Sequence, residues 1–247
     1  MNKVILAHAV ANENGTANGG EPGDQTGKEV RRQDYYISGD GWENVFRAND
    51  PEQAKIIAKT AGDIADNDKI GYSQDKRLTL SVQAQKKNFD CTKIKKKCEC
   101  DCSSLVAVAV NAAGISVPFD MYTGNEKAML ERTGAFQTLP GNTKFDDLKE
   151  GDILHRVGHT AVVCQVISDG KKTYYRVQIV AANNWSTVET YQKLAYERCH
   201  LGTGVAEGRQ TKWIVYCGDY NTKEYADSVA QILHNGGIPT WTYNVTY

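Results

Sequence analysis

The stretch Cys98-Glu99-Cys100-Asp101-Cys102-Ser103-Ser104-Leu105 separates a lysine-rich segment from an apolar one, and our interpretation of the fold starts there. The apolar run 105–110 continues toward Gly114, a residue type that commonly ends helices. Asp101 is a suitable N-cap, so we expect Cys102 at the first helical position, facing backbone N–H groups without an intrahelical partner. Because the helix macrodipole stabilises an anion there, the sequence predicts a lowered pKa and a nucleophilic sulfur at Cys102.

A cysteine nucleophile needs a base, and a histidine base needs a group that orients its second nitrogen. Among the five histidines, His159 follows a glycine and opens the apolar run 159–167. This pattern predicts a strand whose first residue meets the start of the Cys102 helix. His155 lies close by, in a polar turn, and the other three histidines have no comparable setting.

The orienting group is expected after the next strand. Ser168-Asp169-Gly170 is a turn signal, and residues 173–180 alternate as a strand, so we predict a hairpin with the His159 strand. Its end would bring Asn183 and Asn184 beside His159. Either amide could hold the imidazole, and both could equally be turn-forming asparagines.

Composition limits the function classes. The chain has 247 residues, a net charge of −1 and 40% hydrophobic residues, which excludes a strongly basic nucleic-acid binder. It contains no apolar run long enough for a membrane span, and residues 1–8 are too short for a signal peptide. We therefore expect synthesis in the cytoplasm and no membrane partner. Seven cysteines, an odd number, favour free thiols over a disulfide framework.

The elements predicted along the chain give an α+β fold. A short helical segment opens the chain, and helices are expected at residues 50–67 and 73–88, followed by the Cys102 helix, an irregular stretch 116–150 and the strands already described. Tyr35, Tyr36, Trp42 and Phe46 form an aromatic cluster that belongs to the core or lines a groove.

The end of the chain is predicted as a strand–helix–strand unit, with its elements at 213–217, 222–235 and 238–247. We place a catalytic domain at residues 1–190 and an extension at 191–247. This extension is either an edge of the same sheet or a small wall-binding module, and it weakly resembles half of a SPOR peptidoglycan-binding domain.

Three motifs carry a resemblance to a known family. Asp101-Cys102-Ser103-Ser104-Leu105, Gly151-Asp152-Ile153-Leu154 and Gly158-His159-Thr160-Ala161-Val162-Val163 together resemble the papain-like NlpC and CHAP peptidoglycan hydrolases. Asn184-Trp185 resembles the Asn–aromatic pair of the CHAP group, although Ala182 stands where that group often has Glu. Residues 23–30, 71–74 and 120–124 are similar to phage-type endolysins. The resemblance covers roughly residues 1–185.

This resemblance implies a papain-like fold in which the cysteine helix packs on an antiparallel sheet behind extra N-terminal helices. It implies amide hydrolysis in peptidoglycan through an acyl-enzyme, with Cys102, His159 and Asn184 as catalytic residues, no cofactor and no metal. We expect Asp101, Ser103, Trp185, Gln25 and Glu13 to contact the substrate. The enzyme would act on the bacterial wall after release, as in phage lysis.

Three other functions remain open from the sequence. Cys91, Cys98, Cys100 and Cys102 could bind zinc, although their spacing lacks paired C-x-x-C units. The chain could bind the wall without cleaving it, through its aromatic residues. A different acyl-transfer enzyme, such as a transglutaminase, could use the same cysteine and histidine.

Overall fold

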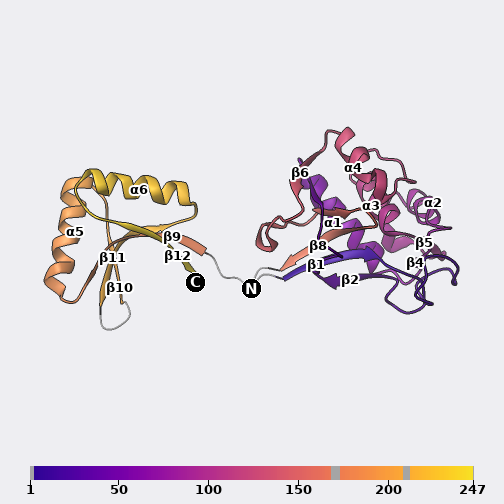
Figure 1. The fold of residues 1–247 in the computed structure, drawn as a ribbon, viewed down its shortest axis with the longest axis horizontal. Helices are drawn as coiled ribbons and strands as arrows, with labels where there is room; N and C mark the ends of the chain where they lie inside the picture. The colour runs from indigo at the N-terminus through magenta and orange to yellow at the C-terminus, as the bar shows by residue number, and fades with distance from the viewer. Residues whose placement is uncertain (1–2, 168–172, 208–211, 247) are drawn as a thin grey trace. The chain divides into compact units, whose positions relative to one another are not determined.

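The computed structural model describes residues 3–167, 173–207 and 212–246, and the chain divides into two units, Met1–Asp169 and Gly170–Tyr247 (Figure 1). Each unit has a hydrophobic core of its own.

An antiparallel sheet organises the first unit. Within residues 3–167 its strand order is β2-β1-β8-β7-β3-β6, so the first and last strands of the unit pair with each other inside the sheet. The strands are β1 (Lys3–Ala9), β2 (Val30–Asp34), β3 (Asn44–Ala48), β6 (Phe136–Pro140), β7 (Ile153–Arg156) and β8 (His159–Ile167). The pairing of β1 with β8 positions the site described below.

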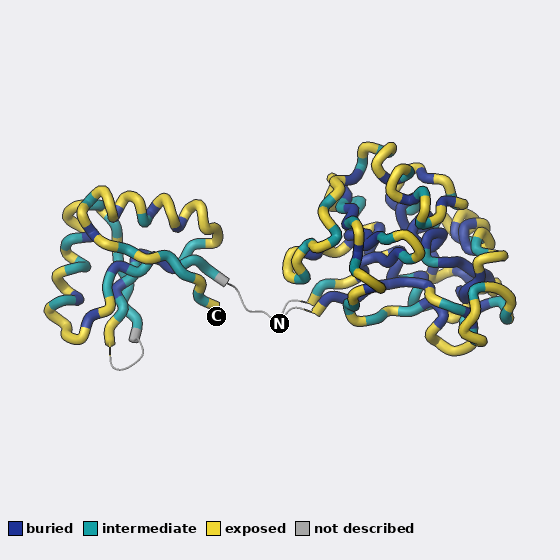
Figure 2. The backbone as a smooth tube through the Cα atoms, in the orientation of Figure 1, coloured by how far each residue is buried: buried dark blue, intermediate teal, exposed yellow. Residues whose placement is uncertain are grey.

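Helices cover one face of this sheet. α1 (Pro51–Ala65) and α3 (Cys102–Ala112) pack against each other and against β1 and β8. Two shorter helices, α2 (Thr79–Gln85) and α4 (Thr123–Arg132), flank them, and β4 (Ile70–Tyr72) pairs in parallel with β5 (Cys98–Cys100). Figure 2 shows that the buried residues concentrate in the sheet and its covering helices. On the opposite face Leu6, Trp42 and Val163 belong to a smaller apolar cluster.

The start of the chain is a strand, and the helix predicted there was wrong. β1 lies between β2 and β8, with one face against the helices and the other against the smaller cluster. A strand buried on both faces reads as a continuous apolar run without alternation, which short segments share with helices. The helix predicted at 73–88 is shorter, because the Ser73 and Gln74 amides donate to carbonyls of other segments.

The cysteine helix agrees with the prediction. Asp101 is the N-cap of α3, and its side chain accepts from the Ser104 amide while Ser104 Oγ accepts from the Asp101 amide. Cys102 is the first helical residue. Gly114, with φ +77°, follows the C-cap, a conformation that L side chains avoid. The predicted α+β class is confirmed, and the papain-like assignment stays a prediction.

The second unit is a β-α-β-β-α-β succession. Its described elements are β9 (Thr173–Ala182), α5 (Trp185–Cys199), β10 (Gly204–Glu207), β11 (Trp213–Tyr220), α6 (Lys223–Asn235) and β12 (Trp241–Thr246). The strand order β10-β11-β9-β12 is antiparallel, which is a split β-α-β arrangement. The predicted strand–helix–strand at the end of the chain is confirmed, as β11, α6 and β12, and it forms half of this unit.

The hairpin predicted between the His159 strand and residues 173–180 is wrong. β8 pairs with β1 and β7, whereas β9 pairs with β11 and β12 in the other unit. The turn signal at 168–170 lies outside the described residues. The predicted domain boundary at residue 190 falls inside α5, about twenty residues after the division between the units.

Leu6→Ala tests the central position of β1. Leu6 is fully buried, so its truncation leaves a cavity and should lower the free energy of unfolding by about 2–5 kcal/mol. Lys3→Ala is the control on the same strand, because it removes only an exposed ion pair with Asp34 and should cost less than about 1 kcal/mol. Urea denaturation measures both. Equal effects of the two variants would contradict a buried β1.

Candidate active site

The sulfur of Cys102 lies where the start of α3 meets the start of β8. The β1–β8 ladder ends with Ala7 opposite Val162, and just beyond that point the Thr160 amide donates to the Cys102 sulfur. The Ser103 amide donates to it as well. One backbone hydrogen bond therefore joins the predicted nucleophile to the residue that follows the predicted base, His159.

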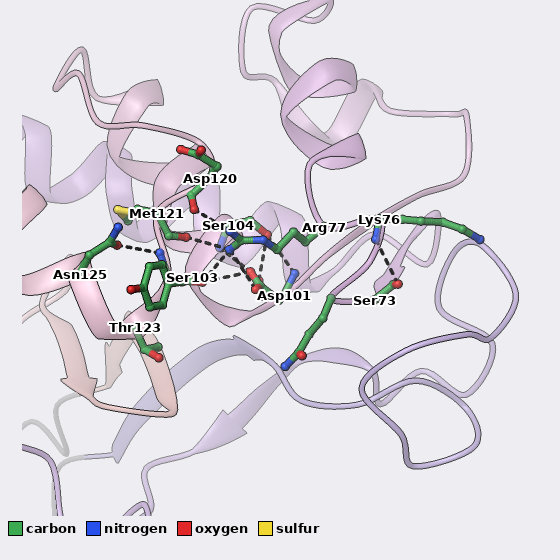
Figure 3. A network of polar contacts seen from close by, with 12 residues as sticks. Ser73, Lys76, Arg77, Asp101, Ser103, Ser104, Asp120, Met121, Thr123 and Asn125 are labelled. Atoms are coloured by element: carbon green, nitrogen blue, oxygen red, sulfur yellow. Dashed lines mark hydrogen bonds and ion pairs between the residues drawn. The ribbon is translucent and has the colours of Figure 1, made fainter.

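Arg77 holds the loop before α4 against the start of α3 (Figure 3). Its Nη1 donates to Asp101 Oδ2 at 3.1 Å and to the Met121 carbonyl at 2.8 Å, and its Nη2 donates to the Asp120 carbonyl at 2.5 Å. These bonds span three segments, so Arg77 fixes the wall of the pocket that opens at Cys102.

That pocket has a volume of about 360 Å³. It is lined by residues of four segments, namely Gln74, Arg77, Asp101, Cys102, Ser103, Tyr122, Thr123 and Gly158. Cys102 is partly exposed in it, whereas Asp101 and Ser103 are almost fully buried. Of the predicted substrate contacts, these two line the pocket, and both are also engaged by Arg77.

The resting sulfur is a thiol, which corrects the prediction of a lowered pKa. Burial raises the pKa of Cys102 to about 12, and the nearby Asp101 and Glu126 add to the rise. The amides of Thr160 and Ser103 oppose it without reversing it. The helix start therefore supplies donors to the sulfur, but removal from water and two acidic neighbours outweigh them.

Hydrogen bonds determine which nitrogen of His159 carries the proton. Arg31 donates from Nε and Nη2 to Gln33 Oε1, so this oxygen faces His8 Nε2, 3.2 Å away, as an acceptor. His8 Nε2 therefore bears a proton, and neutral His8 accepts at Nδ1 from the Tyr36 hydroxyl at 2.9 Å. Tyr36 Oη then accepts from His159 Nε2 at 2.8 Å. His159 is the Nε2–H tautomer, and within residues 3–167 no hydrogen-bond partner contacts its Nδ1.

Both imidazoles in this chain of hydrogen bonds are neutral. Burial lowers the pKa of His159 to about 4, with Arg156 and Arg31 contributing. Burial also lowers the pKa of His8 to about 3, with His159 and Arg31 contributing. Trp42 stacks on the His159 ring, with centroids 6.0 Å apart and planes at 28°. His159 is therefore held in place with a free basic nitrogen at neutral pH.

Tyr36 connects the base to the sulfur. Burial raises the pKa of its hydroxyl to about 12, and Cys102 is near enough to add to the rise. Tyr36 therefore neighbours Cys102 and contacts His159. The other candidate base, His155, is engaged elsewhere, since its Nε2 donates to the Thr123 carbonyl at 2.8 Å and its Nδ1 lies 3.4 Å from Asn44 Nδ2.

Asn184 and Trp185 lie in the second unit. Asn184 is the N-cap of α5, where its side chain accepts from the Thr187 amide at 2.9 Å. Trp185, the first residue of that helix, contacts the Trp213 ring edge-to-face. Because the hairpin does not form, the geometric reason for placing Asn184 beside His159 is lost, and its catalytic role stays a prediction without that support.

Gln25 and Glu13 belong to the loop between β1 and β2. The Gln25 side chain donates to the carbonyls of Pro22 and Gly23, which closes a turn. Glu13 Oε1 accepts from the Glu21 amide, and Glu13 lines a different pocket, of about 330 Å³, together with Arg31. Substrate contact by these two residues stays a prediction.

The other cysteines near Cys102 belong to the core. Cys91, Cys98 and Cys100 are buried, and burial raises the pKa of Cys91 and Cys98 to about 12. In the described ranges no three His, Cys, Asp or Glu residues are arranged as metal ligands. No helix in those ranges is both long and apolar enough to cross a membrane.

The comparison with protein families gives a match over most of the first unit. The endolysin-like domain family matches residues 6–173, more than half of the chain. This chain belongs to the endolysin-like domain family. The match includes Tyr36, Cys102 and His159, so the recognition of an endolysin-like protein is confirmed, while the assignment to NlpC or CHAP stays a prediction.

Other comparisons add little to this assignment. No curated protein matches this endolysin-like chain. Among solved structures, it is similar to the solution structure of the peptidoglycan binding domain of the B. subtilis cell wall lytic enzyme CwlC. The identity is 20%, the TM-score is 0.28, and the match covers 30% of this chain and 91% of that chain.

His8 and Arg77 were not predicted from the sequence as residues of this site, and neither was Glu126 as a buried acid behind it. His8 was passed over because β1 was assigned as a helix, although a histidine inside a strand-like apolar run needs a polar partner when buried. Glu126 lies on α4, in a stretch interpreted as irregular because of its glycines and prolines. Tyr36 was noted only as part of the aromatic cluster.

Histidine NMR tests this assignment of protons in the endolysin-like domain. Two-dimensional ¹H–¹⁵N spectra should show His159 as a neutral Nε2–H tautomer at pH 7, titrating near pH 4, with His8 titrating near pH 3. Unfolded histidines bind protons from about pH 6.5, so stability should fall as the pH drops from 6.5 toward 4. An Nδ1–H tautomer or a pKa of 6 or above at His159 would contradict the network.

Proposed function

We propose that the first unit is a cysteine hydrolase that cleaves an amide bond in the stem peptide or cross-bridge of bacterial peptidoglycan. The observation that carries this proposal is the hydrogen bond from the Thr160 amide to the Cys102 sulfur, because it places the start of the His159 strand at the nucleophile. Membership of the endolysin-like family supports the cell wall as the target.

The neutral resting state favours proton transfer that is coupled to attack. As the Cys102 sulfur bonds to the substrate carbonyl carbon, its proton passes to His159 Nδ1. The His159 Nε2–H stays bonded to Tyr36 Oη and supports the charge that the ring acquires. The oxygen of the tetrahedral intermediate is stabilised by the Cys102 amide at the helix start.

Collapse of this intermediate releases the amine, which takes the proton from His159 Nδ1, and leaves a thioester on Cys102. Water then attacks the thioester carbon while Nδ1 accepts a proton from it. The carboxylic acid product leaves, and the proton returns to the sulfur. The cycle needs no metal or cofactor, and its atoms balance as one amide plus water giving one acid and one amine.

The resemblance to papain-like NlpC and CHAP hydrolases fits this scheme, with one difference. Tyr36 and His8 take the orienting role that the resemblance gives to Asn184. The enzyme would act on the wall after release from the cytoplasm, as phage lysis requires. The alternative is that the chain binds the wall without cleaving it. The two functions are distinguished by whether Cys102 is needed.

Cys102→Ala should abolish cleavage of purified peptidoglycan, lowering the rate by more than about 10³-fold, because no other group in the proposed cycle can form the thioester. Mass spectrometry of the digest should show new amine ends on peptides for an endopeptidase, or free lactyl-sugar with intact stems for an amidase.

Cys199→Ala, which removes a partly exposed thiol of the second unit, is the matched control and should leave the rate unchanged. Cleavage by Cys102→Ala at the wild-type rate, or new reducing sugar ends in the digest, would refute the mechanism.

Tyr36→Phe and Asn184→Ser together identify the orienting group. Tyr36→Phe removes the nearer acceptor of His159 Nε2–H and leaves His8 Nδ1, 3.2 Å away. We expect kcat to fall by about 10- to 100-fold, the range known for groups that orient metal-bound histidines. Asn184→Ser removes the amide but keeps a capping side chain on α5, so cleavage should be unaffected. Loss of cleavage in Asn184→Ser but not in Tyr36→Phe would identify Asn184 as the group that orients His159.

A further inference from the structure

The carboxyl group of Glu126 is fully buried beside the site. Glu126 lies in the first turns of α4 and has no exposed surface. Its Oε1 is 2.8 Å from Thr160 Oγ1, and its Oε2 is buried with no hydrogen-bond partner among the described residues. Thr160 is the residue whose amide donates to the Cys102 sulfur, so this carboxyl lies behind the nucleophile.

If Glu126 were ionised, the contacts around Thr160 Oγ1 would have one proton too few to form hydrogen bonds. Thr160 Oγ1 also lies 3.1 Å from the Leu154 carbonyl, which can only accept. The single hydroxyl proton of Thr160 cannot satisfy both acceptors. If Glu126 carries its own proton, it donates to Thr160 Oγ1, Thr160 donates to Leu154, and each of these contacts is a proper hydrogen bond.

The charges around the carboxyl point the same way. Asp101, the N-cap of α3, is a second acid near Glu126, and Cys102 is an anion when ionised. On β7, His155 is engaged by the Thr123 carbonyl, and β6 contributes no titratable side chain. Arg77, the nearest cation of the site, is paired with Asp101. In residues 3–167 no lysine or arginine forms an ion pair with Glu126, so an anion there would be buried without compensation.

We infer that Glu126 is a buried, uncharged carboxylic acid that permits Cys102 to develop negative charge, and that its ionisation switches the sulfur off. This inference rests on the proposed function for its consequence in catalysis. Glu126 acts on the sulfur through its charge and does not touch the substrate. In its neutral form it also anchors Thr160, whose amide positions the sulfur.

The direction of the pH effect follows from the acid. Burial raises the pKa of Glu126 to about 8, Asp101 adds to the rise, and the Thr160 hydroxyl opposes it. Below that pH the group is neutral. Above it a negative charge appears near Cys102 and opposes the ionisation of the thiol. Activity should therefore decline as the pH rises through about 8, in addition to the acid limb set by His159.

Glu126→Gln tests the inference, because glutamine has the shape of the neutral acid and cannot ionise. The full-length variant should cleave peptidoglycan at pH 7 at close to the wild-type rate and keep this rate at pH 9, where the wild type declines. Alkylation of Cys102 by iodoacetamide, followed by mass spectrometry of its peptide, should be faster at pH 9 in the variant than in the wild type, because no carboxylate then opposes the thiolate.

Glu131→Gln, an exposed position on the same helix, is the control and should keep the wild-type profile. A Glu126→Gln variant that melts normally but is inactive at pH 7, or one that declines like the wild type above pH 8, would overturn the inference.

If Glu126→Gln does not fold, a measurement on the wild-type protein tests the same inference. The ¹³C resonance of the Glu126 carboxyl should report a protonated acid at pH 7, and an ionised group at that pH would overturn the inference. Neither alkylation nor NMR needs peptidoglycan, so these two readouts stand even if the proposed substrate proves wrong. Failure of the wild type to cleave peptidoglycan would count against the proposed function only.

Discussion

The site depends on one backbone hydrogen bond, from the Thr160 amide to the Cys102 sulfur. It forms because the β1–β8 ladder ends before Thr160, which leaves an amide at the start of β8 available to the start of α3. The capping of α3 by Asp101 and the anchoring of Asp101 by Arg77 hold the other side of this junction. Cys102, the predicted nucleophile, is thus joined directly to the strand that carries His159, the predicted base.

The balance of charge in this site differs from that of an activated thiolate. Burial disfavours the charged forms of three of its groups, so the thiol of Cys102, the imidazole of His159 and the acid of Glu126 are all neutral at rest. In the proposed mechanism, Cys102 and His159 become charged only when a substrate carbonyl arrives, so they need no buried ion pair between them at rest. A chain of hydrogen bonds runs from Arg31 through Gln33, His8 and Tyr36 to His159 Nε2, and it leaves His159 Nδ1 unprotonated.

The parts of this structure that could be predicted from sequence are those with local causes. The capped start of α3 follows from Asp101 and the apolar run behind it, and the α6–β12 end follows from simple periodicity. β1 could not be distinguished from a helix, because a strand covered on both faces loses its alternation. Asn184 was placed by a hairpin between strands that in fact belong to different sheets.

The orienting network was beyond sequence reasoning for a different reason. Tyr36 and His8 lie more than 120 residues before His159, and only the pairing of β1 with β8 brings them together. Glu126 likewise acquires its environment from Thr160 on another element. No spacing within a motif encodes these contacts, whereas the Cys102 and His159 motifs each carry a local signal of their own.

The same pairing of β1 with β8 has a consequence for biosynthesis. During translation β1 leaves the ribosome early, but one of its two neighbours in the sheet is made about 150 residues later. Contacts this distant in sequence slow folding and leave an apolar strand edge exposed in the meantime. A nascent chain that already contains α3 therefore lacks the pairing that brings β8 to it, and the candidate site is complete only once the whole unit has been made.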